Sequence, residues 1–143
     1  MLQMNRSPKR LISLGRFFLS APIVCLLHFS EFTDVKADSY YYKAVLWAVE
    51  NKITSGMSDT LFAPDATCSR SQIVTFLYRM QNSPESKAEN PFTDVKADAY
   101  YANAVLWAVE NGVTTGASAT TFDPAGDCTR GQIVTFLYRC LSK

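Results

Sequence analysis

The chain has 143 residues, of which 48% are hydrophobic, and a formal net charge of +1. This length and apolar content allow one modest core or two small ones, which argues against disorder of the whole chain. The charge is unevenly distributed, because residues 1–30 carry four basic side chains and no acidic one, whereas the rest carries 10 basic and 13 acidic ones, a net charge of −3. Such a surface offers no basic stripe for a phosphate backbone, so we expect no nucleic-acid partner.

Residues 1–30 begin with a basic stretch and continue into an apolar stretch over residues 17–27. This order is typical of a secretory signal. A membrane-spanning helix needs about 20 apolar residues, and Pro22 interrupts the short stretch, so we expect no stable membrane span. The segment is interpreted as a signal peptide or leader without an evident cleavage site; a non-functional leader and a membrane anchor remain the alternatives.

An internal repeat dominates the remainder of the chain. A shift of 60 positions superimposes residues 32–80 on residues 92–140 without a gap, and 33 of the 49 aligned positions are identical. The stretch between them is polar and holds two prolines, which indicates a surface linker. The sequence therefore predicts two repeats, residues 31–80 and 92–140, joined by a linker over residues 81–91.

The first helix of each repeat is predicted at about residues 40–51 and 100–111. Asp38 and Asp98 directly precede these segments and are expected to cap them, because a carboxylate accepts free backbone N–H groups at a helix start. The segments are apolar nearly all round, which indicates burial on several sides.

The two copies differ at the end of this helix. The second copy has Gly112, which reaches the left-handed conformation of a C-terminal cap without strain. The first copy has Lys52 in the equivalent place, so its cap must rest on Asn51 or on a strained backbone.

A second helix follows a Phe-x-Pro loop in each repeat, and its apolar residues recur on one side. Its start satisfies the S/T-x-x-Q form of the capping box. The residues of this pattern are Ser69, Arg70 and Gln72 in the first copy and Thr129, Arg130 and Gln132 in the second. Each repeat is thus predicted to be a helix, a loop and a helix.

The arginine in this pattern is not explained by capping. A positive charge in the first helical turn opposes the helix dipole, yet both copies have one, Arg70 and Arg130. Beside free backbone N–H groups, a planar guanidinium forms a site for a carboxylate. The competing interpretation is a salt bridge within the protein, for example to Asp34 or Asp94.

Other candidate side chains carry weaker signals. Trp47 and Trp107 lie in the middle of the first helix, where core packing is a better explanation than a sugar platform. No side chain outside residues 1–30 belongs to a recognisable nucleophile motif, so we do not expect an enzyme.

The chain has four cysteines, Cys25, Cys68, Cys128 and Cys140, and one histidine, His28. The cysteines show no C-x-x-C spacing, so we expect no metal or cofactor. About 18 Å of helix separates Cys140 from Cys128, which excludes a disulfide between them. Small buried thiols are the default expectation for Cys68 and Cys128, and their redox state stays open.

The landmarks Phe-x-Asp-Val, Tyr-Tyr-Ala-x-Ala-Val-x-Trp-Ala, Gly-Val-x-x-Gly, Phe-x-Pro and Thr-Arg-x-Gln-x-Val, taken in this order, resemble the S-layer homology repeat of bacterial cell envelopes. The resemblance implies an all-α fold in which tandem helix-loop-helix repeats pack around a shared helical bundle. It also implies a non-catalytic module at the cell wall or cell surface of a Gram-positive bacterium. Such a module binds a pyruvylated secondary cell-wall polysaccharide non-covalently, in grooves between repeats.

The family's Thr-Arg-Ala-Glu signature matches Arg70 and Arg130, and the glycine of its preceding turn matches Gly56 and Gly116. Glutamine replaces the glutamate in both copies, and it still forms a cap. The resemblance and the residue patterns together predict a ligand-binding set of Arg70, Arg130, Gly56, Gly116, Ser69, Thr129, Gln72, Gln132, Trp47 and Trp107.

Repeat number leaves alternatives open. The family usually works with three repeats, and this chain has two. The alternatives are therefore a structural or protein-interaction module that self-associates into a homo-oligomer, or a fragment of a longer surface protein.

Overall fold

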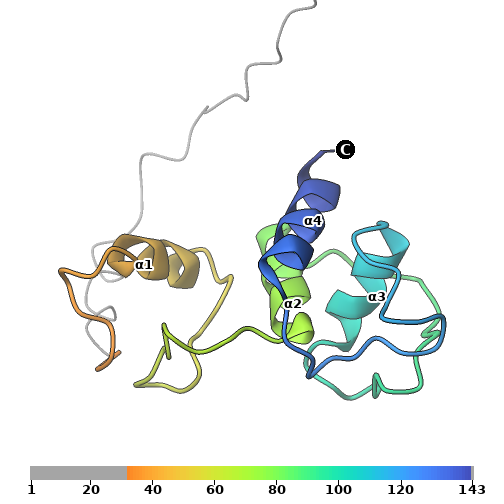
Figure 1. Ribbon diagram of the computed structural model, residues 1–143, viewed down its shortest axis with the longest axis horizontal. Coiled ribbons are helices and arrows are strands. Elements are labelled where there is room, and N and C mark those ends of the chain that lie inside the picture. Colours follow the sequence, from red (N-terminus) through yellow and green to blue (C-terminus); the bar gives the residue numbers. More distant parts are fainter. Residues whose placement is uncertain (1–31, 143) are drawn as a thin grey trace, which may run out of the picture.

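The computed structural model describes residues 32–142. Within them the chain forms four helices, α1 (Tyr42–Glu50), α2 (Arg70–Met80), α3 (Ala102–Glu110) and α4 (Arg130–Leu141) (Figure 1). The described residues contain no strand, only a single antiparallel bridge between Ser69 and Asp127. The all-α fold and the helix-loop-helix order of each repeat are confirmed.

The leader predicted over residues 1–30 lies outside the described residues. Among the helices of residues 32–142, none is long and apolar enough to cross a membrane.

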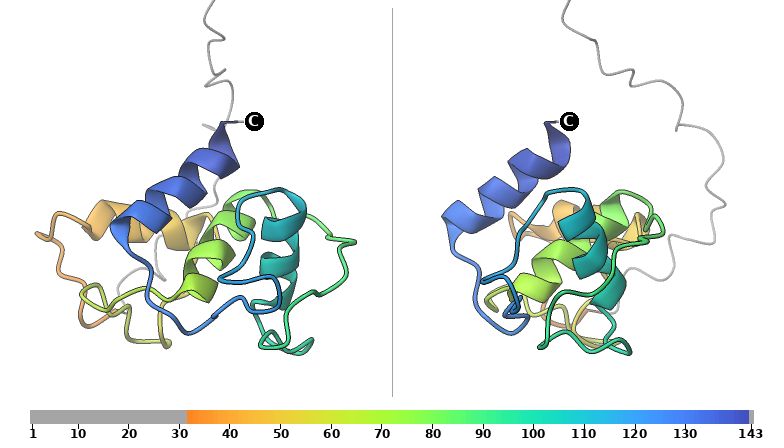
Figure 2. Two further views of the ribbon diagram at one scale, coloured as in Figure 1. Left: turned by 45° about the vertical axis from the view of Figure 1, so that its right-hand side comes forward. Right: turned by 90° about the vertical axis from the view of Figure 1, so that its right-hand side faces the viewer.

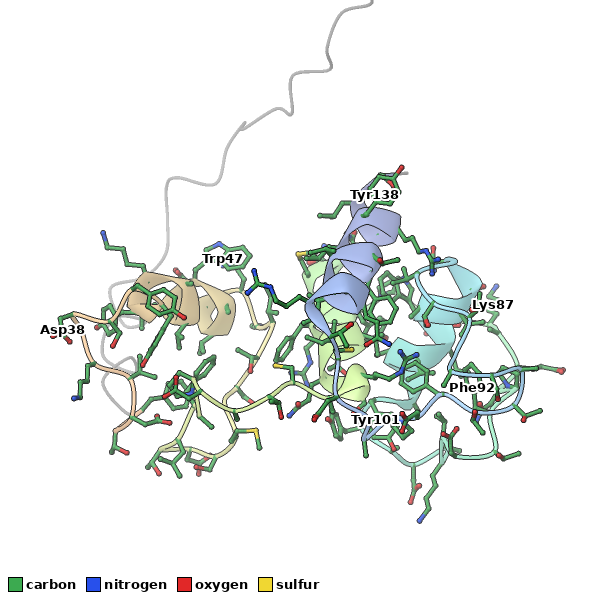
Figure 3. All side chains as sticks on the ribbon, viewed as in Figure 1. Asp38, Trp47, Lys87, Phe92, Tyr101 and Tyr138 are labelled. Carbon is green, nitrogen blue, oxygen red and sulfur yellow. The ribbon has the colours of Figure 1, made fainter. Side chains whose placement is uncertain are left out.

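The predicted helix caps Asp38 and Asp98 are wrong. Each first helix begins two residues later than predicted, and its N-cap residue, Tyr41 or Tyr101, makes no side-chain cap bond. In the first copy a backbone turn, closed by the N–H of Tyr42 donating to the carbonyl of Ser39 at 3.0 Å, comes between the aspartate and the helix. Figure 3 shows Asp38 at the outer end of this loop, so its carboxylate does not meet the free N–H groups of α1.

The expected strain at the end of α1 is present. Lys52 adopts a left-handed backbone with φ +58°, and Gly112 has nearly the same φ of +62° at the end of α3. A side chain in this conformation costs roughly 1 kcal/mol that glycine does not. The first copy therefore keeps the same helix ending as the second at a cost in stability.

Helix α2 is the centre of the fold. It packs against both α3 and α4, whereas α1 packs against no other helix of the described chain. Figures 1 and 2 show α2 and α4 side by side with α3 against α2, and Figure 1 shows α1 set apart from them. The buried core accordingly joins side chains of both repeats. Its members include Val74 and Leu77 from α2, Val105, Trp107 and Ala108 from α3, Phe136 from α4 and Phe122 from the loop before α4.

A loop with the same contacts completes each repeat. In the second copy, the rings of Phe92 and Phe122 lie 5.7 Å apart between centroids. The carboxylate of Asp94 accepts backbone N–H bonds from Phe122 at 2.8 Å and from Asp123 at 2.7 Å. Burial raises the pKa of Asp94, but these N–H bonds outweigh it and leave the pKa below the ordinary value. The Phe-x-Asp-Val motif is therefore a structural clamp on the Phe-x-Pro loop.

The first copy repeats this clamp. Asp34 accepts N–H bonds from Phe62 at 3.0 Å and from Ala63 at 2.6 Å. The bond from Phe62 lowers the pKa of Asp34 below its ordinary value, and the bond from Ala63 adds to the effect. Within residues 32–142, neither Asp34 nor Asp94 forms an ion pair with an arginine at a helix start; both carboxylates are used by backbone N–H groups.

Candidate functional site

Both predicted capping boxes are present. The Ser69 hydroxyl accepts the N–H of Gln72 at 3.3 Å, and the Gln72 side-chain oxygen accepts the N–H of Ser69 at 2.8 Å. In the second copy, Thr129 and Gln132 make the same two bonds, at 3.3 and 2.9 Å. These four residues therefore fix the start of α2 and of α4.

Arg70 lies inside the protein, where only 6% of its surface is exposed. Its Nε donates to the carbonyl oxygen of Phe122 at 2.9 Å. The guanidinium carbon lies 5.1 Å from the centre of the Phe122 ring and 5.5 Å from that of Phe136, so the cation is held between two aromatic rings. The Nη2 atom is buried and has no hydrogen-bond partner within the described residues.

The free N–H groups predicted at the start of α2 are also occupied. The N–H of Arg70 donates to the carbonyl of Gly126 at 2.8 Å, and the N–H of Ser71 donates to that of Pro124 at 3.1 Å. The loop of the second repeat thus lies where an anion would bind. Arg70 and the start of α2 form a joint between the two repeats.

Arg130 has the same place in α4 but a different environment. Its side chain is exposed. Among residues 32–142, no carbonyl accepts the N–H groups of Arg130 and Gly131, which correspond to the occupied pair in α2. A side-chain carbon added at Gly131 would come only within 3.9 Å of the Thr129 hydroxyl, so the backbone here is open. Of the two helix-start arginines, only Arg130 combines an exposed guanidinium with N–H groups that have no acceptor in the described chain.

The glycines of the predicted set have a steric role. Gly56 and Gly116 have φ values of +82° and +90°. A side-chain carbon would lie 2.5 Å from Phe32 at the first position and 2.6 Å from Phe92 at the second. Both positions therefore require glycine, because the ring of Phe32 or Phe92 packs directly on the turn.

The two tryptophans differ in burial. Trp107 is 5% exposed and lies in the core, with its ring centre 5.7 Å from that of Tyr78, so the expected core packing is confirmed for it. Trp47 is 54% exposed, and for it that expectation is wrong. Figure 3 shows Trp47 projecting from α1. The reason is that α3 lies against α2, whereas α1 has no helix against it in the described chain.

Two shallow grooves lie away from the arginine positions. One is lined by Val49, Lys52, Thr54, Ser55, Asp59 and Arg79, and the other by Gln81, Pro84, Trp107, Asn111, Val113, Cys140 and Leu141. Arg70 and Arg130 line neither groove. An open groove alone identifies no ligand, whereas the start of α4 presents a guanidinium beside free N–H groups.

A second pair of arginines plays a part that the sequence analysis did not assign. Arg79, near the end of α2, donates to the carbonyl of Ile53 at 3.2 Å, and Arg139 in α4 is placed likewise, 3.5 Å from the carbonyl of Val113. These bonds link the second helix of each repeat to the segment that follows its first helix. The sequence shows an arginine at this position in both copies, but it does not show which carbonyl accepts its hydrogen bond.

The fold and site define a class, a tandem all-α repeat module whose repeats interlock through a helix-start arginine. The chain belongs to the S-layer homology domain family, whose model matches residues 31–74 and 91–134. It is 34% identical over 118 residues to a surface-layer 125 kDa protein of Lysinibacillus sphaericus, covering 81% of this chain and 10% of that protein.

Other relatives are similar in the same way. A cell surface protein of Thermoanaerobacter kivui is 30% identical over 141 residues, which are 93% of this chain and 18% of the relative. Endo-1,4-beta-xylanase A of Thermoanaerobacterium saccharolyticum is 31% identical over 85 residues, 59% of this chain and 7% of the enzyme. The chain therefore spans less than a fifth of these relatives, and its family places it at the bacterial cell surface.

Proposed function

We propose that this chain is a non-catalytic anchoring module that binds a pyruvylated secondary cell-wall polysaccharide non-covalently. Membership of the S-layer homology family and its surface-protein relatives support the anchoring role. The observation that carries the choice of ligand is the open start of α4, where Arg130 is exposed beside free N–H groups.

The chemistry of this position suits a carboxylate on a sugar. The N–H groups of Arg130 and Gly131 point out of the helix start, where the helix dipole favours negative charge. The guanidinium adds two parallel donors in a planar fork, which match the two oxygens of a ketal carboxylate. Arg70 cannot serve this ligand in the described structure, because its guanidinium is enclosed between two rings.

The test is co-sedimentation with purified cell walls that carry the pyruvylated polysaccharide. Arg130→Ala is expected to weaken binding about tenfold, since one charge-assisted contact contributes about 1.5 kcal/mol or more. Lys96→Ala is the matched control, because it removes an exposed positive charge from a loop of the same repeat and should bind like the wild type.

Two outcomes would contradict the proposal. Failure of the wild-type chain to sediment with these walls would contradict the proposed anchoring function. Equal binding to walls with and without pyruvyl groups, unchanged in Arg130→Ala, would exclude the carboxylate and the position assigned to it.

A second candidate function, self-association, is favoured by the uncovered faces of α1 and α4. On α2, Val74 is fully buried and Leu77 is 5% exposed, whereas their counterparts on α4, Val134 and Leu137, are 60% and 36% exposed. On the facing side, Trp107 of α3 is covered and its counterpart Trp47 of α1 is not. The α2–α3 contact within one chain therefore shows how the exposed faces of α4 and α1 would pack against each other.

We propose that α4 of one copy packs against α1 of a second copy as α2 packs against α3. Because 33 of 49 positions are identical between the repeats, the shapes of the two faces are largely those of the existing contact. In such an assembly Arg130 would meet the carbonyl of Phe62, as Arg70 meets that of Phe122. This use of Arg130 competes with anion binding, so wall polysaccharide should dissociate the oligomer.

Light scattering across protein concentration tests this contact. The wild type is expected to form a discrete oligomer at high concentration, and Val134→Asp is expected to stay monomeric, because a charge cannot be buried there unpaired. Tyr100→Asp is the control, since Tyr100 is 66% exposed and lies outside both faces. A wild type that is monomeric throughout, or an oligomer that survives Val134→Asp, would contradict the proposed contact.

A further inference from the structure

Cys68 and Cys128 lie opposite each other where the two repeats meet. The neighbouring residues Ser69 and Asp127 form the antiparallel bridge. One step outward from it, the N–H of Cys128 donates to the carbonyl of Cys68 at 3.1 Å. The two cysteines therefore occupy the hydrogen-bonded pair position next to the bridge.

This position places their side chains within reach of each other. Residues opposite each other at a hydrogen-bonded antiparallel position have Cα atoms about 5.5 Å apart. Disulfides join Cα atoms about 4.4–6.8 Å apart. Side chains of residues that lie directly opposite each other in an antiparallel pair project to the same side, so both thiols lie on one side. Both cysteines pack against the hydrophobic core. Both are free and half-buried.

We propose that Cys68 and Cys128 form a disulfide that cross-links the two repeats once the protein meets an oxidising environment. The cell-surface location supplies such an environment. The oxidant is a small-molecule disulfide such as oxidised glutathione. One thiolate attacks it, forming a mixed disulfide and releasing one small thiol; the second thiolate then displaces the other small thiol. Two protein thiols are oxidised and one small disulfide is reduced to two thiols.

The surroundings of the two thiols raise their pKa values and so affect the pH at which the exchange is fast. Burial raises the pKa of the Cys68 thiol. Burial also raises the pKa of the Cys128 thiol, with smaller effects from the nearby charges, Arg70 lowering it and Cys68 and Asp127 raising it. Because the thiolate is the attacking species, the exchange should be slow at neutral pH and faster in mildly alkaline buffer.

The other described cysteine is not an alternative partner. Cys140 lies near the end of α4, where its sulfur is 3.7 Å from the side-chain nitrogen of Gln81 at the end of α2. Cys68 and Cys128 lie just before the starts of these two helices. The cross-link would therefore lock the joint at the helix starts that also contains Arg70.

The experiment uses the full chain with Cys25→Ser and Cys140→Ser, so that only the pair remains. Oxidised glutathione at pH about 8.5 is expected to remove both free thiols and to lower the intact mass by two hydrogen atoms, in a monomer. Proteolysis should then yield a peptide pair joined through Cys68 and Cys128. The melting temperature should rise by roughly 10 °C and fall back on reduction, because the bond closes a long loop in the unfolded chain.

The control adds Cys128→Ser to the same chain, and it should gain one glutathione adduct without a rise in melting temperature. Three results would overturn the proposal: glutathione adducts on both cysteines, a disulfide-linked dimer, or a cross-link that lowers the melting temperature. All readouts are mass and stability, so they do not depend on wall binding.

Discussion

Arg70→Ala is expected to lower the free energy of unfolding by about 3 kcal/mol, whereas Arg130→Ala should change it by less than about 0.5 kcal/mol. The two residues have the same place in helices whose residues 72–79 and 132–139 are identical. Alanine at 70 removes the contacts with the Phe122 and Phe136 rings and leaves the Phe122 carbonyl without its donor. Alanine at 130 removes only an exposed side chain.

Urea denaturation followed by circular dichroism measures this difference. Arg70→Met is an informative third variant, because it keeps most of the packing volume and removes the buried charge, whose Nη2 is unsatisfied within the described residues. Its loss of stability should be smaller than that of Arg70→Ala. Equal losses for Arg70→Ala and Arg130→Ala would mean that the interlocking joint does not contribute to stability.

Gly116→Ala is expected to lower the free energy of unfolding by about 3 kcal/mol, and Gly112→Ala by only about 1 kcal/mol. Both glycines have a left-handed backbone, so both variants incur its cost. At Gly116 the new carbon would also lie 2.6 Å from the Phe92 ring and 2.8 Å from the carbonyl oxygen of Ser118, whereas nothing lies within 4 Å of the carbon added at Gly112.

Comparing Gly116→Ala with Gly112→Ala separates steric clash from backbone strain. Both variants incur the cost of a left-handed backbone, but only Gly116→Ala adds a clash. The same urea denaturation gives both values, and near-ultraviolet circular dichroism reports whether the Phe92 and Phe122 rings keep their packing. A Gly116→Ala protein as stable as Gly112→Ala would show that the clamp loop moves aside at little cost. In that case glycine at this turn would need an explanation other than the Phe92 contact.

The joint between the repeats could not be predicted from the sequence. The S/T-x-x-Q pattern predicted both helix starts correctly, because a capping box is made within four consecutive residues. The same pattern gave Arg70 and Arg130 one common interpretation. The carbonyls of Gly126 and Pro124, which occupy the start of α2, lie more than fifty positions along the chain, and no local pattern indicates such a contact.

The incorrect helix caps have a similar cause. Asp38 and Asp98 satisfied the composition of a cap, but the turn that precedes the helix determines which residue lies at its first free N–H groups. The aspartates of the clamp, Asp34 and Asp94, bind backbone N–H groups 28 and 29 positions away. The sequence named them as candidate ion-pair partners of the helix-start arginines and did not show which groups they bind.

The amino-acid sequence by itself determined the duplication, the order of helix, loop and helix in each copy and the two capping boxes. The duplication is visible by direct comparison of the two copies, and the helices and capping boxes depend on residue types within a few positions of each other. Only the tertiary structure decided which copy of each feature is buried. Trp107 and Arg70 are enclosed because α2 lies against the second repeat, and Trp47 and Arg130 are exposed because no further repeat lies against α1 or α4 among the described residues. Burial is a property of neighbours in space, and two identical motifs can differ in it completely.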